Sequence, residues 1–280
     1  MAWRIGVDIG GTFTDVALVK EGSGQIGVAK VPTTVPNFAD GVLSGLRRAM
    51  ADYDIQAGDV SLLSHATTVV TNAILEEQGA RAGLVSTRGF RDVLEMRRAA
   101  RADLYDLFQD PPAVLVPRRR RFEITERIGA DGNVVVPLAE AEIDQLIADL
   151  KQQQVEAIAV SLLFSFLNPE HERVLGERLR AAFPDTPVFL SSEVLPEIKE
   201  FERTSTTAVC AYVGPTLTDY LSKLEAAVSE LGLPQLYVMG SNGGIFEAAE
   251  GRSMPAMAVE SGPAENAIDS GDAGGGKVQR

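Results

Sequence analysis

The sequence has few cysteines and histidines and an excess of acidic residues, and each of these features excludes a class of protein. A single cysteine, Cys210, excludes an internal disulfide and fits a reducing compartment. The formal net charge of −13 argues against nucleic-acid binding, because affinity for phosphates rests on basic side chains. No segment approaches the ~18 consecutive apolar residues of a membrane span, and "MAWRIGVDIG" lacks the parts of a signal peptide. We therefore expect a soluble, cytoplasmic protein that binds neither nucleic acid nor a membrane.

Strand-like and helix-like segments alternate along most of the 280 residues, which is typical of an α/β layered sheet. Short, glycine-bounded runs near the start predict antiparallel strands, whereas residues 88–133 predict an irregular excursion from the main sheet. The segment "TTVVTNAILEEQG" predicts a helix whose end is marked by Gly79. A long helical region follows over about residues 197–231. We place domains at 1–190 and 191–266 and a flexible tail at 267–280.

The segment "VDIGGTFTD" carries the clearest chemical signal. An apolar strand ends in Asp8, and Gly10 and Gly11 let the backbone turn tightly and approach a ligand without a Cβ in the way. The amide groups of such a turn form a nest for anions, and the hydroxyls of Thr12 and Thr14 add donors. A carboxylate beside that nest would repel phosphate unless a cation lay between them, so Asp8 implies Mg²⁺. The alternative is a tight hairpin with a side-chain-stabilised turn.

This segment resembles the first phosphate motif of the actin/hexokinase/Hsp70 ATPase superfamily. With Thr-Phe-Thr-Asp after the glycines, it is similar in particular to the hydantoinase A/5-oxoprolinase/acetone carboxylase family. Further blocks of that family recur in the same order, among them "SHATTVVTNAILEEQGAR", "STRGFRDVLEMRR", "MGSNGG" and "ESGPA". The resemblance implies a ribonuclease H-like (actin-like ATPase) α/β fold, with a mixed sheet flanked by helices and the second ATPase lobe truncated or missing.

The resemblance also implies a function. Members of the family activate a carbonyl or enol oxygen of a lactam, imide or ketone by phosphoryl transfer from ATP with Mg²⁺. We expect a subunit of such an enzyme, which needs larger hydantoinase- or carboxylase-like partner subunits in a hetero-oligomer and acts on a small cyclic amide or ketone. We assign catalytic roles to Asp8, Thr12 and His65, with Asp8 also as the metal ligand. Cofactor binding is assigned to Gly10, Gly11, Thr12, Thr14 and Asp15, and substrate binding to Thr67, Thr68 and Arg91.

Several of these residues also have structural interpretations. His65, Thr67 and Thr68 lie between a buried strand and a helix, where ligands bind in α/β folds. In the alternative interpretation His65 is packed in the core and one threonine caps the helix. Arg91 belongs to the block "RGFRD", and it is expected either to reach an anionic group or to form a surface ion pair.

Two other features favour structural roles. No H-E-x-x-H pair accompanies His171, so we expect a structural or surface role for it. The run Arg118–Arg121 is expected at a solvated strand edge or a subunit contact.

The last third of the chain departs from the family pattern. Gly240 stands where a glutamine is usual, and Glu265 and Asn266 replace small residues. The tail contains "DAGGGK", which fails as a P-loop because no serine or threonine follows the lysine. Three alternatives remain open: a catalytic subunit completed by another chain, a non-catalytic assembly subunit, or a truncated fragment. A sugar kinase is a weaker alternative.

Overall fold

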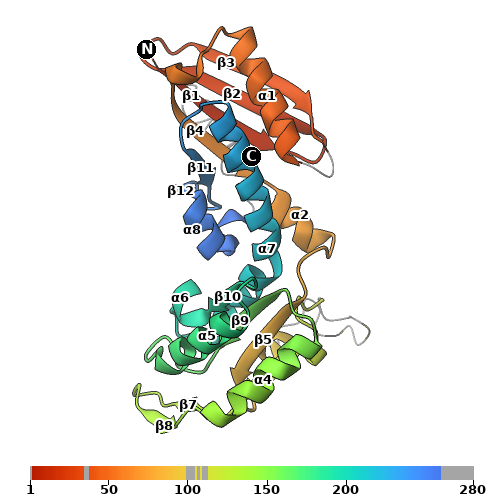
Figure 1. Cartoon of the computed structure of the whole chain (residues 1–280), viewed down its shortest axis with the longest axis vertical. Coiled ribbons are helices and arrows are strands. Elements are labelled where there is room, and N and C mark those ends of the chain that lie inside the picture. The colour runs from red at the N-terminus through yellow and green to blue at the C-terminus, as the bar shows by residue number, and fades with distance from the viewer. Residues whose placement is uncertain (1, 35–37, 99–104, 106–107, 109–112, 260–280) are drawn as a thin grey trace. The chain divides into compact units, whose positions relative to one another are not determined.

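The computed structural model describes residues 2–34, 38–98, 105, 108 and 113–259, which form two units (Figure 1). Unit 1 comprises residues 1–78 and 216–280, and unit 2 comprises residues 79–215. The domain boundary predicted near Ser191 is not tested by this division into units, and it stays a prediction. The segment after Val259, which includes the predicted flexible tail at 267–280, lies outside the described residues.

Unit 1 is built on a six-stranded mixed sheet in the order β12-β11-β4-β1-β2-β3. β1 pairs with β2 and β2 with β3 in antiparallel fashion, whereas β4 runs parallel to both β1 and β11. Its strands are β1 (Trp3–Ile9), β2 (Phe13–Lys20), β3 (Ile26–Pro32), β4 (Val60–Thr67), β11 (Leu236–Met239) and β12 (Ile245–Glu247). Its helices are α1 (Phe38–Asp52), α2 (Val69–Leu75), α8 (Ala248–Ser253), the 3₁₀ turns η1 (Ala57–Asp59) and η3 (Pro255–Ala258), and the second half of α7 (Glu200–Glu230).

Alternating burial along the first strands shows why this sheet folds. Trp3, Ile5, Val7 and Ile9 of β1 are all buried, whereas the residues between them are more exposed, as expected for a strand with one covered face. Helix α1 lies across β1–β3 (Figure 1), and burying its apolar stripe there stabilises both elements. The predicted ribonuclease H-like mixed sheet flanked by helices is confirmed.

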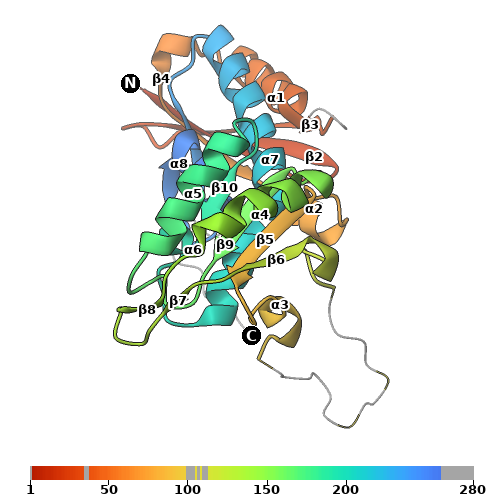
Figure 2. The ribbon, with the colours of Figure 1, turned by 60° about the horizontal axis from the view of Figure 1, so that its bottom comes forward.

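Unit 2 contains a four-stranded parallel sheet in the order β10-β9-β5-β6. Its strands are β5 (Ala82–Thr87), β6 (Arg121–Ile124), β9 (Ala157–Ser161) and β10 (Val188–Leu190), with a separate hairpin of β7 (Arg127–Ile128) and β8 (Val134–Val136). Its helices are α3 (Val93–Met96), η2 (Arg118–Arg120), α4 (Glu140–Gln152), α5 (Glu170–Ala182), α6 (Ser191–Val194) and the first half of α7. Helices α4 and α5 lie side by side over one face of this sheet (Figure 2) and enclose the apolar core with it.

Two predictions about secondary structure were wrong in part. The segment 88–133 is not wholly an excursion, because β6 pairs in register with β5 inside the sheet. Helix α2 ends at Leu75, and Glu77 adopts the left-handed conformation beyond it. Gly79 is needed for a different reason: a Cβ there would lie 2.1 Å from the ring of Tyr212.

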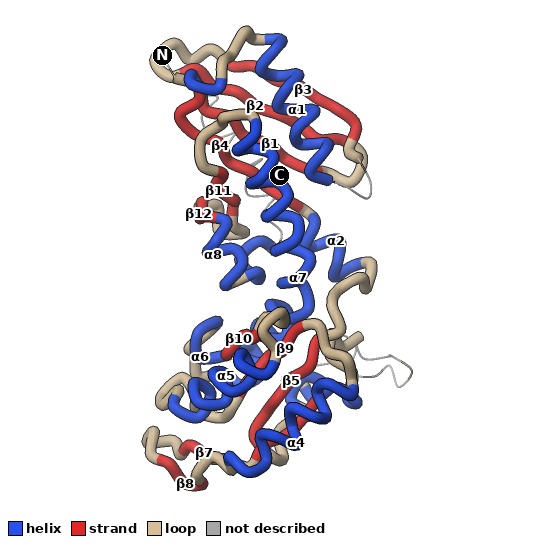
Figure 3. The backbone as a smooth tube through the Cα atoms, viewed as in Figure 1, coloured by secondary structure: helices blue, strands red, loops and turns tan. Residues whose placement is uncertain are grey.

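The predicted long helix is confirmed as α7 (Figure 3). It runs for 31 residues, and Pro215 lies inside it. The division between the units falls immediately after this proline. Among the described residues, no helix combines the length and the apolar character needed to cross a membrane.

Candidate functional site

The candidate site begins at the turn between β1 and β2, formed by Gly10, Gly11 and Thr12 and called here the glycine turn. The Gly10 N–H donates to the Phe13 carbonyl at 2.9 Å, which closes the turn. Thr33, just after β3, donates from its backbone N–H to the Thr12 carbonyl and from its hydroxyl to the Gly10 carbonyl. A Cβ on Gly11 would meet no atom within 4 Å, so the outer side of the turn is open to a ligand.

Asp8 lies two residues before the turn and pairs across the strands with Asp15. Burial, and secondarily the charge of Asp15, raise the pKa of the Asp8 carboxyl above its ordinary value. The Asp8 Oδ1 atom is buried and has no hydrogen-bond partner in the described part of the chain. When the Asp8 carboxyl is ionised, little in the unit therefore compensates its charge.

These features fit a hydrated Mg²⁺ ion. Mg²⁺ is usually bound by one or two carboxylates together with water and substrate phosphates, and an unpartnered carboxylate oxygen next to an open glycine turn supplies one such ligand. Among the described residues, no group of three or more acidic, histidine or cysteine side chains could hold a metal by itself. The arrangement thus suits an ion that arrives with phosphates.

The remaining residues of the motif have structural contacts. Thr14 is completely buried, and its hydroxyl lies 3.2 Å from that of Thr33 beneath α1. Its side chain is therefore on the covered face of the sheet, away from the exposed Thr12. Asp15 is half exposed and forms an ion pair with Lys30 at 2.8 Å. Cofactor binding by Thr14 and Asp15 stays a prediction, and these contacts favour support of the turn.

His65 is fully buried beside Val7 on the neighbouring strand. Its Nδ1 lies 3.0 Å from the Val7 carbonyl and its Nε2 lies 2.6 Å from the Tyr220 hydroxyl. A carbonyl only accepts, so Nδ1 carries the proton and Nε2 accepts from Tyr220. Burial lowers the pKa of His65 to about 4, so the ring is neutral near pH 7. Its catalytic role stays a prediction, and the geometry is that of a structural pair.

Thr67 and Thr68 connect β4 to α2. The buried Thr67 hydroxyl accepts from the Val69 N–H at 3.1 Å, which satisfies a free amide at the helix start. Thr68 donates to the Ile9 carbonyl at 3.0 Å and so ties this loop to the end of β1. Substrate binding by these threonines stays a prediction.

A cavity of about 310 Å³ lies beside the glycine turn within unit 1. Gly11 contributes to its wall, α2 contributes Val69, Asn72 and Ala73, and Glu76 follows directly after α2. This volume lies at the lower end of the range for small-molecule sites. The open side of the turn therefore faces a space that can admit part of a ligand.

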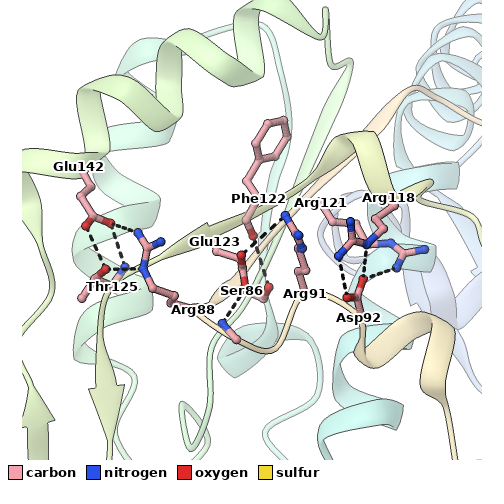
Figure 4. Close-up of polar contacts among 11 residues, drawn as sticks. Ser86, Arg88, Arg91, Asp92, Arg118, Arg121, Phe122, Glu123, Thr125 and Glu142 are labelled. Atoms are coloured by element: carbon pink, nitrogen blue, oxygen red, sulfur yellow. Dashed lines mark hydrogen bonds and ion pairs between the residues drawn. The ribbon is translucent and has the colours of Figure 1, made fainter.

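Arg91 lies in unit 2, among the groups of polar contacts drawn in Figure 4. Its Nη1 is 3.7 Å from Glu123, whose other oxygen accepts from the Gly89 N–H at 2.6 Å. In a neighbouring group of contacts, Arg88 donates to Thr125 and Glu142. These contacts fix the loop after β5. Substrate binding by Arg91 stays a prediction.

The expectation of a solvated arginine run is wrong for Arg121. Its side chain is only 1% exposed and donates to the Val116 carbonyl, Asp92 and Glu95. Arg118 binds both oxygens of Asp92 at 3.0 and 3.2 Å (Figure 4). Two of the four arginines therefore anchor the loop that carries Asp92.

Sequence reasoning missed the polar groups that are buried in the two units. Tyr220 lies 155 residues after its partner His65, and no local pattern marks it. In unit 2, Glu172 accepts from the Leu162 and Ser192 amides and from the Ser191 hydroxyl. In the sequence, a glutamate two residues after the start of an amphipathic helix is typical of an ordinary first-turn acid, so only the fold shows that it is buried.

Comparison with known families gives the same result as the motif. The family profile of the hydantoinase/oxoprolinase N-terminal region matches residues 4–183, and that of the hydantoinase/oxoprolinase domain matches residues 203–272. The chain belongs to the hydantoinase/oxoprolinase family. The resemblance inferred from the sequence is thereby confirmed.

Characterised members of this family include subunits of different enzymes. The chain is 38% identical to the caprolactamase alpha subunit of Pseudomonas jessenii, over 94% of this chain and 38% of that protein. It is 30% identical to the acetophenone carboxylase gamma subunit of Aromatoleum aromaticum, over 89% of this chain and 37% of that protein. The chain thus spans about two fifths of the length of these relatives.

Solved structures agree with the sequence comparison. Nucleotide-free acetone carboxylase matches 98% of this chain and 41% of its own, with a TM-score of 0.87 and 28% identity. ATP-dependent caprolactamase from Pseudomonas jessenii matches 93% of this chain and 39% of its own, with a TM-score of 0.83 and 38% identity. The fold of the hydantoinase/oxoprolinase family therefore covers nearly the whole chain.

Proposed function

We propose that this chain carries the first phosphate-binding turn of an ATP-dependent enzyme that activates a carbonyl or enol oxygen by phosphoryl transfer. The observation that carries the proposal is the unpartnered Oδ1 of Asp8 beside the open glycine turn. Two relatives support it, because caprolactamase and acetone carboxylase are both described as ATP-dependent. A small cyclic amide or ketone is the proposed substrate.

Each residue of the turn has a distinct task in this proposal. The backbone amides of Gly11 and Thr12 and the Thr12 hydroxyl bind phosphate oxygens. Asp8 would hold Mg²⁺, and such an ion would supply positive charge beside the phosphates. Lys30 pairs with Asp15 and reduces the negative charge that phosphates would meet. Thr33 fixes both ends of the turn, which keeps the amides in place before a ligand binds.

His65 and Tyr220 act as supporting residues. Their hydrogen bond joins β4 to α7 inside unit 1, and the His65 Nδ1–H bonds to β1 immediately before Asp8. This arrangement holds the strand that carries the metal ligand. We propose that a partner subunit supplies further groups of the site, since relatives of this chain are named subunits of larger enzymes.

Gly11→Ala tests the proposal directly. A Cβ at this position points into open space, so the fold should be unaffected while the methyl group occupies the position of a phosphate. We expect binding of Mg-ADP, measured by isothermal titration calorimetry, to weaken by about tenfold or more. This change corresponds to ~1.4 kcal/mol, the scale of one hydrogen bond to a charged group.

Gly58→Ala is the matched control. Gly58 is also exposed, and a Cβ added there would meet no atom within 4 Å. It lies near the start of β4, at the end of the sheet that is farther from the glycine turn. The substitution should leave both nucleotide affinity and melting temperature unchanged.

Equal Mg-ADP affinity in the two variants would contradict phosphate binding at the turn. If the unaltered chain binds no nucleotide even with its co-purifying subunits, it is an assembly subunit that does not use ATP.

A further inference from the structure

The parallel sheet of unit 2 has a topological switch point that the glycine turn does not involve. From β5 the chain crosses to β6 on one side, whereas from β9 it continues to β10 on the other side. The loops after β5 and β9 therefore diverge, and they leave a crevice at the carboxyl ends of the two strands. Ligands of open α/β sheets bind at such points.

A cavity of about 920 Å³ occupies this position. The loop after β5 contributes Gly89 and Phe90, and the loop after β9 contributes Leu163 and Phe164. Residues 198–202, at and before the start of α7, form a further wall. The volume lies within the range of small-molecule sites, which is about 300–1,000 Å³, so the cavity is large enough for a compact organic ligand.

Much of the wall is apolar and open to solvent. Met96 is 71% exposed and Ile198 is 66% exposed, and both line the cavity with Val93 and Leu163. Large apolar side chains grouped around a hollow are typical of a binding site. The body of the ligand should therefore be aliphatic or aromatic.

The charges of the wall point to an anionic group on the ligand. Lys199 and Arg127 line the cavity, and neither forms an ion pair within 4.0 Å in the part of the chain that the structure describes. Arg127 instead lies over the ring of Phe90, with 4.9 Å between its guanidinium carbon and the ring centroid. Two cations held at an apolar crevice suit a carboxylate.

The acidic side chains of the wall are largely neutralised. Asp92 is bound by Arg118 and Arg121. Glu200 acts electrostatically on the buried Arg203. Glu202 accepts from Arg98 Nε at 2.6 Å, and this contact lowers the pKa of Glu202, which therefore stays an acceptor.

One acceptor of this wall still lacks a donor. The Oε2 atom of Glu202 is buried and has no hydrogen-bond partner among the described residues. A buried oxygen of this kind costs free energy until it is bonded. An N–H group on the ligand would satisfy it.

From these contacts we propose that the cavity of unit 2 binds a small carboxylate with an apolar body and an N–H group, such as an N-acylated amino acid. Lys199 and Arg127 bind its carboxylate, the cluster around Leu163 and Ile198 holds its apolar body, and Glu202 accepts its N–H. The site is separate from the nucleotide proposal, because every residue that lines it belongs to unit 2.

The test is calorimetric titration of the whole chain with N-acetylnorleucine as the probe. Two analogues each lack one feature: N-acetylnorleucine amide has no carboxylate, and hexanoate has no N–H. We expect saturable binding of the probe in the millimolar range or tighter, and weaker binding of both analogues. Lys199→Gln should weaken binding of the probe about tenfold, the value for one charge-assisted hydrogen bond, and should not change binding of the amide.

Lys151→Gln is the matched control. Lys151 belongs to α4 of the same unit, is exposed and lies over the ring of Phe183. The variant should bind the probe as the unaltered chain does. Asp8→Asn should also leave probe binding unchanged, which separates this inference from the nucleotide site. Absence of saturable binding, equal binding of acid and amide, or an unaltered affinity in Lys199→Gln with a native circular dichroism spectrum would each overturn the proposal.

Discussion

Single residues in this protein have roles that residue type alone does not settle. Asp8 and Glu202 each hold a buried carboxylate oxygen without a partner in the described chain. His65, in contrast, has both ring nitrogens occupied and is neutral. The two orphan oxygens are therefore better candidates for ligand contact than the buried histidine.

Asp8→Asn should stabilise the protein when no metal is present. The pKa of Asp8 is raised in the folded state, so the folded protein holds this proton to a higher pH than the unfolded chain does. Ionised Asp8 therefore lowers the free energy of unfolding. This loss of stability grows as pH rises above the ordinary carboxyl pKa and is absent below it. We expect the variant to gain about 1 kcal/mol at pH 7 by urea unfolding, with the gain disappearing near pH ~3, below the ordinary carboxyl pKa.

Added Mg²⁺ provides the complementary measurement. It should raise the free energy of unfolding of the unaltered chain, because a ligand that binds only the folded state stabilises it, and should not stabilise Asp8→Asn. Asp52→Asn is the control, since its ion pair with Arg48 is exposed and such pairs contribute little. Equal stability of Asp8→Asn and the unaltered chain at all pH values would refute the view that Asp8 is an uncompensated charge.

At the scale of elements, the start of β5 depends on a contact with a distant helix. The Ala80 N–H donates to the carbonyl of Tyr212 at 2.8 Å, and the Tyr212 ring lies against Gly79. Tyr212 is buried in the part of α7 that belongs to unit 2. A glycine that the sequence pattern predicts to be a helix stop is thus a packing residue.

Gly79→Ala should therefore be destabilising. Its Cβ would lie 2.1 Å from the Tyr212 ring, and the ring would have to move within a packed unit. We expect a loss of about 1–3 kcal/mol in the free energy of unfolding, the usual cost of overpacking, measured by urea titration.

A double-mutant cycle with Tyr212→Leu identifies the cause. Once the ring is gone, Gly79→Ala should cost much less than it does in the unaltered chain. An equal cost in both backgrounds would show that the backbone of Gly79, and not the ring, requires glycine.

At the scale of the whole molecule, the chain combines two units, and each carries its own proposed ligand site. Unit 1 presents a glycine turn, one orphan carboxylate and a cavity at the turn. Unit 2 presents an apolar cavity at the switch point of a parallel sheet, lined by two cations that have no ion pair among the described residues. The two proposals can accordingly be tested on one chain with two ligands.

Hydrogen exchange should distinguish the two sites. Mg-ADP is expected to slow amide exchange in the glycine turn and in the β4–α2 loop, since bound ligands suppress local opening. N-acetylnorleucine should instead slow exchange in the loops after β5 and β9. If Mg-ADP protected only unit 2, or the probe only unit 1, the assignment of ligands to units would be wrong.

The sequence by itself determined the family, the first mixed sheet and the long helix. Each rests on local information: a glycine motif, alternating apolar residues and a long helical pattern act over neighbouring residues. The alternation in β1 also agrees with which of its faces is buried.

Only the tertiary structure decided which polar residues of those segments are available to a ligand. Thr14 and His65 lie beside the glycine turn in sequence or in the sheet, yet both are buried by helices from other parts of the chain. Arg121 is buried within a run of arginines, where Asp92, just before α3, and Glu95 of α3 both accept from it. Burial and pairing depend on contacts between residues far apart in the chain, and a single sequence carries no record of those contacts.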